Sequence, residues 1–229
     1  MVKCVPFGQP CCTPTVDKPH PYGVTVQDHG ADPFAPWLLA CSPRQGGNCD
    51  AVADSLCKGL SGQHTAGPTV TFLRDHPVAP CSSCGSCARQ RLACPHLNMD
   101  ASAPLFDALC KARTLVLVAP IYFYHVPAQL KALIDRSQPW WMARDIWKDP
   151  PFSQRNAHII LVGARPKGER LFEGALLSLR YWLDLFGYTL ASPLTLNSLD
   201  RPEDFRNSPD HQALVADYAE SIKTTLAGD

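Results

Sequence analysis

The chain has 229 residues, of which 21 are basic and 21 are acidic, so its formal net charge is zero. This length suits one domain with a full hydrophobic core. The balanced charge gives no indication of a nucleic-acid partner or an anionic membrane surface, and no apolar run is long enough to span a membrane. The cysteine count of eleven is odd and no signal-peptide pattern precedes the first strand, so we expect a reducing cytoplasm.

Residues 1–34 differ in composition from the rest of the chain. They are rich in proline, include Cys4, Cys11 and Cys12, and show no sustained apolar period. This composition predicts a poorly ordered extension, followed by one domain over 35–229.

From Pro36 onward, short apolar runs alternate with segments of helical period, which is typical of a parallel sheet covered by helices on both faces. Of the predicted strands, 114–119 is the most strand-like, so we expect it at the centre of the sheet. The other strands are predicted at 37–41, 69–73, 157–163 and 189–196. Helices are predicted at 49–60, 102–111, from about 127 onward, 169–186 and 208–226.

The first strand leads into a glycine-containing loop, Ser42-Pro-Arg-Gln-Gly-Gly-Asn48, and then into a helix. Such a junction directs free backbone N–H groups and the positive end of a helix dipole at an anion, and phosphate is the natural guest. Ser42 and Asn48 are predicted to donate to phosphate oxygens, Arg44 to supply a positive charge, and Asn48 also to cap the helix. The loop has neither a dinucleotide fingerprint nor a Walker pattern.

The predicted central strand ends in Pro120-Ile-Tyr-Phe-Tyr-His125, which carries three aromatic side chains and a histidine. Ligands of open α/β sheets bind at the carboxyl edge of the strands. The segment is therefore a candidate binding site, with ordinary core packing of Tyr122 and Phe123 as the alternative.

Four cysteines fall within fourteen residues, at Cys81, Cys84, Cys87 and Cys94. This spacing is typical of thiolates that hold an iron–sulfur cluster, and the Cys94-Pro95 pair also ends the bacterial ferredoxin run. Structural zinc, which usually takes two separated cysteine pairs, and free or redox-active thiols remain the alternatives. Disulfides would need an oxidising compartment.

These three motifs together resemble the NAD(P)H-dependent FMN reductases of the flavodoxin-like superfamily. More narrowly, they resemble the iron–sulfur flavoproteins of bacteria and archaea, in which a compact cysteine run lies between the phosphate loop and the flavin-ring loop. The segments 129–132 and 135–136 are similar to the helix behind that ring loop. The resemblance implies a doubly wound five-stranded parallel sheet in the order 2-1-3-4-5, with the cysteine-rich loop 81–94 after the second strand.

The resemblance implies two cofactors, FMN and a 4Fe-4S cluster. The cluster ligands would be Cys81, Cys84, Cys87 and Cys94. The FMN contacts would be Ser42, Arg44, Gly47, Asn48, Cys49, Pro120, Ile121, Tyr122, Phe123, Tyr124, His125 and Gly163.

The function implied is an oxidoreductase that moves electrons between FMN, the cluster and an external carrier. NAD(P)H or a ferredoxin-type protein would donate the electrons, and a small molecule would accept them. No side chain is predicted to act as a catalytic nucleophile, because the flavin carries the chemistry. The alternatives are a plain NAD(P)H-dependent FMN or quinone reductase whose cysteine loop binds zinc or no metal, and a non-enzymatic metal-binding or redox-sensing module.

The predicted helix 169–186 is apolar on two sides. One stripe faces the core, and a second stripe of Leu177, Tyr181 and Leu185 has no sheet to cover it. Aligned exposed apolar groups more often mark a contact surface, and the neighbouring segment 139–142 has the Trp and Met content of interfaces. We therefore expect a homodimer or homotetramer, with folding of the 139–152 segment over this stripe as the alternative.

Overall fold

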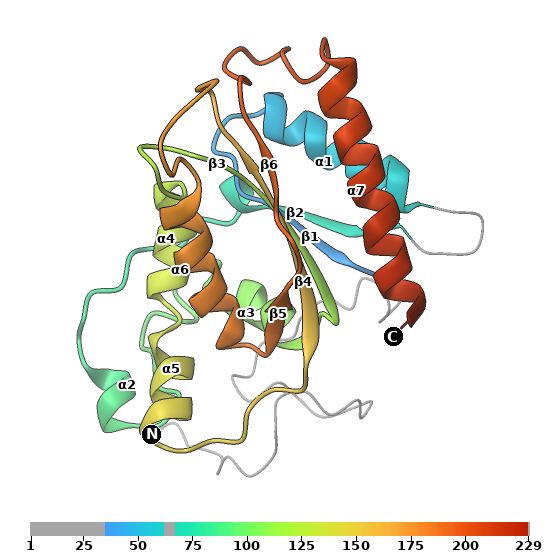
Figure 1. The fold of residues 1–229 in the computed structure, drawn as a ribbon. Helices are drawn as coiled ribbons and strands as arrows, with labels where there is room; N and C mark the ends of the chain where they lie inside the picture. Colours follow the sequence, from blue (N-terminus) through green and yellow to red (C-terminus); the bar gives the residue numbers. More distant parts are fainter. Residues whose placement is uncertain (1–34, 62–66, 229) are drawn as a thin grey trace.

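The computed structural model describes residues 35–61 and 67–228 as a parallel sheet between two layers of helices (Figure 1). The predicted extension 1–34 lies outside the described residues. The strand order is β2-β1-β3-β4-β5, and β6 also pairs with β4, so the predicted order 2-1-3-4-5 is confirmed. The strands are β1 (Trp37–Ala40), β2 (Thr69–Phe72), β3 (Thr114–Pro120), β4 (Arg155–Val162), β5 (Tyr188–Leu190) and β6 (Leu194–Leu196).

The helices divide between the two faces of the sheet (Figure 1). One face is covered by α1 (Asn48–Leu60) and α7 (Pro209–Gly228). The other is covered by α3 (Ser102–Lys111), α4 (Ala128–Asp135), α5 (Gln138–Asp145) and α6 (Glu173–Asp184). Two short helical segments, η1 (Leu73–Asp75) and α2 (Ser86–Arg89), follow β2.

The centre of the sheet is β3, as predicted, and all of its residues are buried. Leu115 and Leu117 face the core beneath α3 to α6, whereas Val116 and Val118 face the core beneath α1 and α7. A strand that is buried on both faces needs an uninterrupted apolar sequence, and this explains why 114–119 is so strand-like.

The predicted last strand, 189–196, is two short strands in the structure. β5 pairs with the beginning of β4 and β6 with its end. Pro193 lies between them, and proline has no N–H group to donate to a strand ladder. The interruption follows from that missing donor.

The predicted second stripe on the 169–186 helix is partly wrong. Leu177 and Tyr181 are 56% and 67% exposed, but Leu185 is only 7% exposed and belongs to the core. Leu185 follows the last residue of α6, Asp184, with its backbone still helical, and it joins the core cluster that contains Trp140, so the 139–152 segment covers this end of the stripe. Trp182 of α6 is buried, and its indole N–H donates to Ser137 Oγ at 2.7 Å.

The tryptophan-rich segment forms the short helix α5, which the sequence reading did not predict. Trp140 is buried and stacks on Phe106 with 4.2 Å between ring centroids, whereas Trp141 is 40% exposed. One of the two tryptophans in this segment is therefore buried within the chain, and the other is left at the surface. Over the described residues, we find no helix with the length and apolar character needed to cross a membrane.

Candidate functional site

A groove at the carboxyl edge of the sheet brings the phosphate-loop motif and the flavin-ring motif together. It lies between the β1–α1 loop, the end of β3 and the end of β4, and encloses about 90 Å³. Eight of the residues predicted to contact FMN line it: Ser42, Arg44, Gly47, Asn48, Cys49, Pro120, Ile121 and Tyr122. The sequence reading missed four further lining residues, Val162, Ala164, Leu199 and Asp200.

The β1–α1 loop has the features of an anion site. Helix α1 begins after Gly47 without any side-chain cap, so the first N–H groups of the helix keep their hydrogen-bonding capacity. A Cβ atom at Gly47 would lie 3.2 Å from the Arg44 side chain. Arg44 is exposed at the mouth of the groove and forms no ion pair with any described residue. The loop therefore offers N–H donors and one uncommitted positive charge to a phosphate.

A carboxylate beside the loop is already paired within the fold. Asp50 accepts the Gly46 N–H at 2.7 Å and pairs with Arg74 at 2.9 Å. Gly46 has a φ of 72°, a conformation that favours glycine. The Asp50 charge is thus matched by Arg74, and Arg44 remains unpaired.

Asn48 is not the helix cap that the sequence predicts, since Gly47 holds that position. The Asn48 amide donates to Arg201 O at 2.8 Å and accepts the Phe205 N–H at 3.0 Å. Its side chain fastens the segment before α7 to the loop, so only its backbone N–H is left for an anion. The Ser42 hydroxyl donates to Arg44 O and accepts the Arg44 N–H, both at 3.2 Å, and this shapes the loop.

The two cysteines beside the loop are buried thiols. Burial, followed by the neighbouring Asp50 carboxylate, raises the pKa of Cys49 to about 12. Burial also raises the pKa of Cys41 well above its ordinary value. Cys49 therefore faces the groove as a neutral thiol, and its backbone N–H at the start of α1 is its polar contribution.

The aromatic segment after β3 forms a tight two-residue turn. Tyr122 and His125 exchange backbone hydrogen bonds of 2.9 and 3.1 Å, and the residues between them, Phe123 and Tyr124, have φ values of 51° and 65°. Left-handed backbone at a bulky residue costs on the order of 1–2 kcal/mol, so this turn is strained. Such strain persists where the surroundings fix it, and it often accompanies function.

Only Tyr122 of this turn lines the groove. Phe123 is fully exposed, Tyr124 is 40% exposed, and His125 hydrogen-bonds Ser178 of α6 through its Nε2 at 3.0 Å. Gly163 is buried, with its N–H bonded to Leu196 O at 2.7 Å. The structure does not bring Phe123, Tyr124, His125 and Gly163 into the groove, and their contact with FMN stays a prediction.

The four cysteines of the 81–94 loop line a second cavity, of about 390 Å³. Cys81 and Cys84 are exposed, and Cys87 and Cys94 are partly buried. Partial burial, followed by the other three thiols of the run, raises the pKa of Cys87. Hydrogen bonds with the Ser86 side chain and backbone lower the pKa of Cys84. Within residues 35–61 and 67–228, no three His, Cys, Asp or Glu side chains are grouped closely enough to hold one metal ion.

A buried arginine holds both ends of this cysteine loop. Arg136, 2% exposed, donates to Ala79 O at 3.0 Å, to the Asp100 carboxylate at 2.8 Å and to Ser102 Oγ at 3.0 Å. Partial burial raises the pKa of Asp100, but hydrogen bonds from Ser102, Ala79 and Arg136 outweigh that effect and leave its pKa below the ordinary value. The segment before Cys81 and the segment after Cys94 are thereby fixed to the end of α4.

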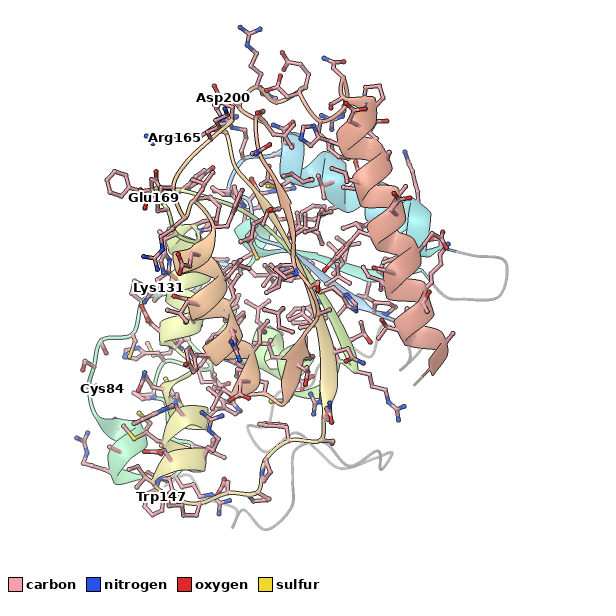
Figure 2. All side chains as sticks on the ribbon, viewed as in Figure 1. Cys84, Lys131, Trp147, Arg165, Glu169 and Asp200 are labelled. Carbon is pink, nitrogen blue, oxygen red and sulfur yellow. The ribbon has the colours of Figure 1, made fainter. Side chains whose placement is uncertain are left out.

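The cavity and the groove share no lining residue and lie at opposite ends of α4. The aromatic turn precedes α4 and Arg136 follows it, and an eight-residue helix is about 12 Å long. Figure 2 shows the same separation, with Asp200 and Arg165 at one end of the molecule and Cys84 toward the other.

Both donor sets fit the cofactors expected for them. The free N–H groups and Arg44 suit a phosphate, and the enclosed part of the groove has room for that end of FMN, with Tyr122 at the open side. Four thiols on the wall of one cavity suit a polynuclear cluster, whose cysteines bind different irons and so stand farther apart than the ligands of one ion.

Comparison with known proteins gives consistent relatives. The model of the NADPH-dependent FMN reductase family matches residues 37–192. An iron–sulfur flavoprotein of Methanosarcina thermophila is 29% identical over 152 residues, which cover 65% of this chain and 72% of that protein. Another, from Methanocaldococcus jannaschii, is 30% identical over 101 residues, or 44% of this chain and 50% of that protein.

Solved structures show the same fold. An NAD(P)H:quinone oxidoreductase from Methanothermobacter marburgensis superposes with a TM-score of 0.60 at 14% identity, covering 82% of this chain and 96% of that one. A structure of an NADH:FMN oxidoreductase in its apo form gives a TM-score of 0.54 at 16% identity, covering 85% and 91%. The family model, by contrast, matches more than half of the sequence and includes both the phosphate loop and the aromatic turn. The chain therefore belongs to the NADPH-dependent FMN reductase family and is a flavin-dependent oxidoreductase.

Proposed function

We propose that this oxidoreductase is of the iron–sulfur flavoprotein type, with FMN in the groove and a 4Fe-4S cluster on Cys81, Cys84, Cys87 and Cys94. The observation that carries the proposal is the gathering of these four thiols on one cavity wall. Two of the curated relatives, from Methanosarcina thermophila and Methanocaldococcus jannaschii, are named iron–sulfur flavoproteins. A flavin exchanges electrons in pairs or singly and a cluster exchanges one at a time, so the pair converts between the two modes.

The protein's own contribution is to bind and to separate the two cofactors. The β1–α1 loop and Arg44 would hold the FMN phosphate, and Tyr122 would border the flavin ring. Arg136, which lines the cavity together with the four cysteines, would keep the cysteine loop in place. The external partners proposed are NAD(P)H or a ferredoxin-type carrier and a small-molecule acceptor, with the protein working in the cytoplasm.

The experiment is a visible absorption spectrum of anaerobically purified protein, with iron, acid-labile sulfide and FMN counted per chain. We expect flavin bands with a broad brown shoulder. Cys87→Ser should lose iron and sulfide together while FMN stays bound, because the groove and the cavity share no residue. Cys57→Ser is the matched control, since Cys57 is a partly buried thiol on α1, remote in sequence from the loop.

The plain FMN or quinone reductase, with zinc or no metal in the cysteine loop, is the competing function. It predicts flavin bands without the brown shoulder. Zinc in place of iron, or iron that survives in the Cys87→Ser protein, would overturn the cluster while leaving the flavin chemistry intact.

We also propose that the protein is a homodimer or homotetramer with α6 in the interface. Leu177 and Tyr181 lie four residues apart on α6 and are both more than half exposed. Because groove and cavity are separate within one chain, a second subunit offers a way to bring a cluster near a flavin. The test of this interface is given with the predictions below.

A further inference from the structure

The network that holds the cysteine loop leaves one donor of Arg136 unused. Nη1 of Arg136 donates to Ala79 O and to the Asp100 carboxylate, and Nη2 donates to Ser102 Oγ. The third nitrogen, Nε, is shielded from solvent and has no hydrogen-bond partner among residues 35–61 and 67–228. A buried N–H group of a charged side chain is costly to leave unpaired, so it indicates a partner that these residues do not provide.

Arg136 borders the cavity of the four cysteines. Besides the thiols, the side chains on this cavity wall that can carry charge are His96, Asp135 and Arg136. Asp135 is 44% exposed and pairs with Lys131 at 2.6 Å, whereas the Arg136 side chain is 1% exposed. The most deeply buried charge beside the thiols is therefore a cation, and a guanidinium keeps its charge in proteins.

A buried cation with a spare N–H group suits the charge of the proposed cluster. Four thiolates make a bound cluster negative, and reduction adds one more negative charge. Hydrogen bonds to the sulfurs and a nearby positive charge both stabilise the more negative form, and burial strengthens both effects. The Asp100 carboxylate opposes part of the Arg136 charge, but it binds the Nη1 end of the guanidinium at 2.8 Å and leaves the Nε–H group available.

We propose that Arg136 donates its Nε–H to a sulfur of the cluster held in this cavity and thereby raises the reduction potential of the cluster. The acceptor is an inorganic sulfide or a cysteine thiolate. One side chain then has two roles, because it fixes the loop that carries the ligands and favours the reduced form of what they bind. This inference rests on the proposed cluster at Cys81, Cys84, Cys87 and Cys94.

The first test is a redox titration of the anaerobically purified full chain, followed by electron paramagnetic resonance. Arg136→Gln removes the charge and the Nε–H group, and its amide can still meet Asp100 or Ser102. The equilibrium constant for reduction of the cluster should fall about tenfold, the scale of one hydrogen bond to a charged group, which is 59 mV for a one-electron couple. Reduction of FMN in the same sample should change less than about twofold, since groove and cavity share no lining residue.

Two further variants separate this effect from a purely structural one. Asp100→Asn removes the negative charge that opposes Arg136 and keeps an amide oxygen for the Ala79 N–H, so reduction should become up to about tenfold more favourable. Arg144→Gln breaks an arginine–aspartate pair at the surface, outside the cavity lining, and should change the equilibrium less than about twofold. A merely structural role would lower the cluster content in the Arg136 and Asp100 variants without shifting the potential in opposite directions.

A second measurement identifies the hydrogen bond without changing the network. Wild-type protein labelled with 15N in arginine alone should show coupling of that nitrogen to the reduced cluster in pulsed electron paramagnetic resonance, because an N–H···S bond transfers spin density to the nitrogen. Arg136→Lys with the same label should lose this coupling, and this assigns it to Arg136 and not to Arg89 or Arg91 of the loop.

Potentials within about twofold of the wild-type equilibrium in both Arg136→Gln and Asp100→Asn would overturn the inference, as would the absence of arginine 15N coupling in the wild type. If Arg136→Gln assembles no cluster, Asp100→Asn and the labelled wild type decide the matter. Failure of the proposed function would instead appear as wild-type protein that contains no iron and no acid-labile sulfide, so the two failures are distinguishable.

Discussion

The flavin groove and the cysteine cavity are built in different ways. The groove is made where three parallel strands end at the same edge, and its anion donors are backbone N–H groups at the start of α1. The cavity is made by an irregular loop that one buried side chain, Arg136, fastens to α4. The first site follows from regular structure, whereas the second depends on a few polar contacts between distant residues.

Removing Arg136 should have the largest effect. Arg136→Ala removes the charge partner of Asp100, which keeps only its hydrogen bonds from Ala79 and Ser102, and loss of one member of a buried pair costs about 3 kcal/mol in the free energy of unfolding. Urea denaturation measures this cost. The variant should also purify with less iron and with its full content of FMN.

Arg144→Ala is the control for that change. Arg144 pairs with Asp184 on the surface at 2.9 Å, with both side chains well exposed, so its removal should cost about 0.5 kcal/mol or less. If Arg136→Ala and Arg144→Ala lower the free energy of unfolding by similar amounts, Arg136 does not have the structural role assigned to it. If Arg136→Ala loses FMN in parallel with iron, the two sites are not separate.

The Arg44 side chain tests the groove. Arg44→Ala removes a charge-assisted phosphate contact worth roughly 1.5–3 kcal/mol, so FMN affinity should fall about 10- to 100-fold. Riboflavin, which has no phosphate, should be much less affected, and fluorescence titration compares the two. Lys58→Ala, at the far end of α1, should alter neither affinity. An equal loss for FMN and riboflavin would show that Arg44 does not meet the phosphate.

Acidification should affect the face beneath α7 before it affects the cysteine cavity. His158 of β4 is 2% exposed, and neither of its ring nitrogens has a hydrogen-bond partner within the described part of the chain. Its ring meets the edge of Tyr218, whose own pKa burial raises to about 12. Burial lowers the pKa of His158 below its ordinary 6.5, so the folded state keeps it neutral while the unfolded state takes up a proton.

The stability that depends on neutral His158 is therefore complete above about pH 6.5 and is lost as the pH falls toward the lower folded pKa. His158→Leu should raise the free energy of unfolding by about 1 kcal/mol at pH 5.5 and by less at pH 7.5. Asp100 has its folded pKa below its ordinary 3.8, so its contribution is complete above that value and is lost only at lower pH. Urea titrations of the wild-type and His158→Leu proteins at pH 5.5 and pH 7.5 measure how the free energy of unfolding depends on pH. If that dependence is the same in both proteins, His158 is not its source.

The smallest effect on folding is expected at α6. Replacing Leu177 by Glu and Tyr181 by Lys should change the free energy of unfolding by about 0.5 kcal/mol or less, since both side chains are exposed. Sedimentation should nevertheless show a folded species smaller than the wild type. A wild-type protein that already sediments as a monomer at micromolar concentration would rule out the α6 interface.

The sequence predicted most of the sheet because its strands carry uninterrupted apolar runs, and it predicted the groove because the two motifs follow consecutive neighbours in the sheet. It did not predict Leu199 and Asp200 as lining residues, since they reach the groove only through the return of β6 beside β4. It misassigned Leu185 because a helical period does not reveal which other segment of the chain covers a helix face. Arg136 hydrogen-bonds Ala79, which lies 57 positions earlier in the chain, and Asp100, which lies 36 positions earlier. No local sequence pattern predicts contacts over such separations.

The packing of α7 on α1 has a consequence for synthesis of the chain. A Cβ atom at Gly59 would lie 2.8 Å from Ala219, and Val215 and Ile222 complete the core over Val116 and Val118. One face of the sheet thus stays open until residues up to about 222 have left the ribosome. The cysteine loop emerges more than a hundred residues earlier, so its thiols are accessible to iron and oxidants while the domain around them is still incomplete.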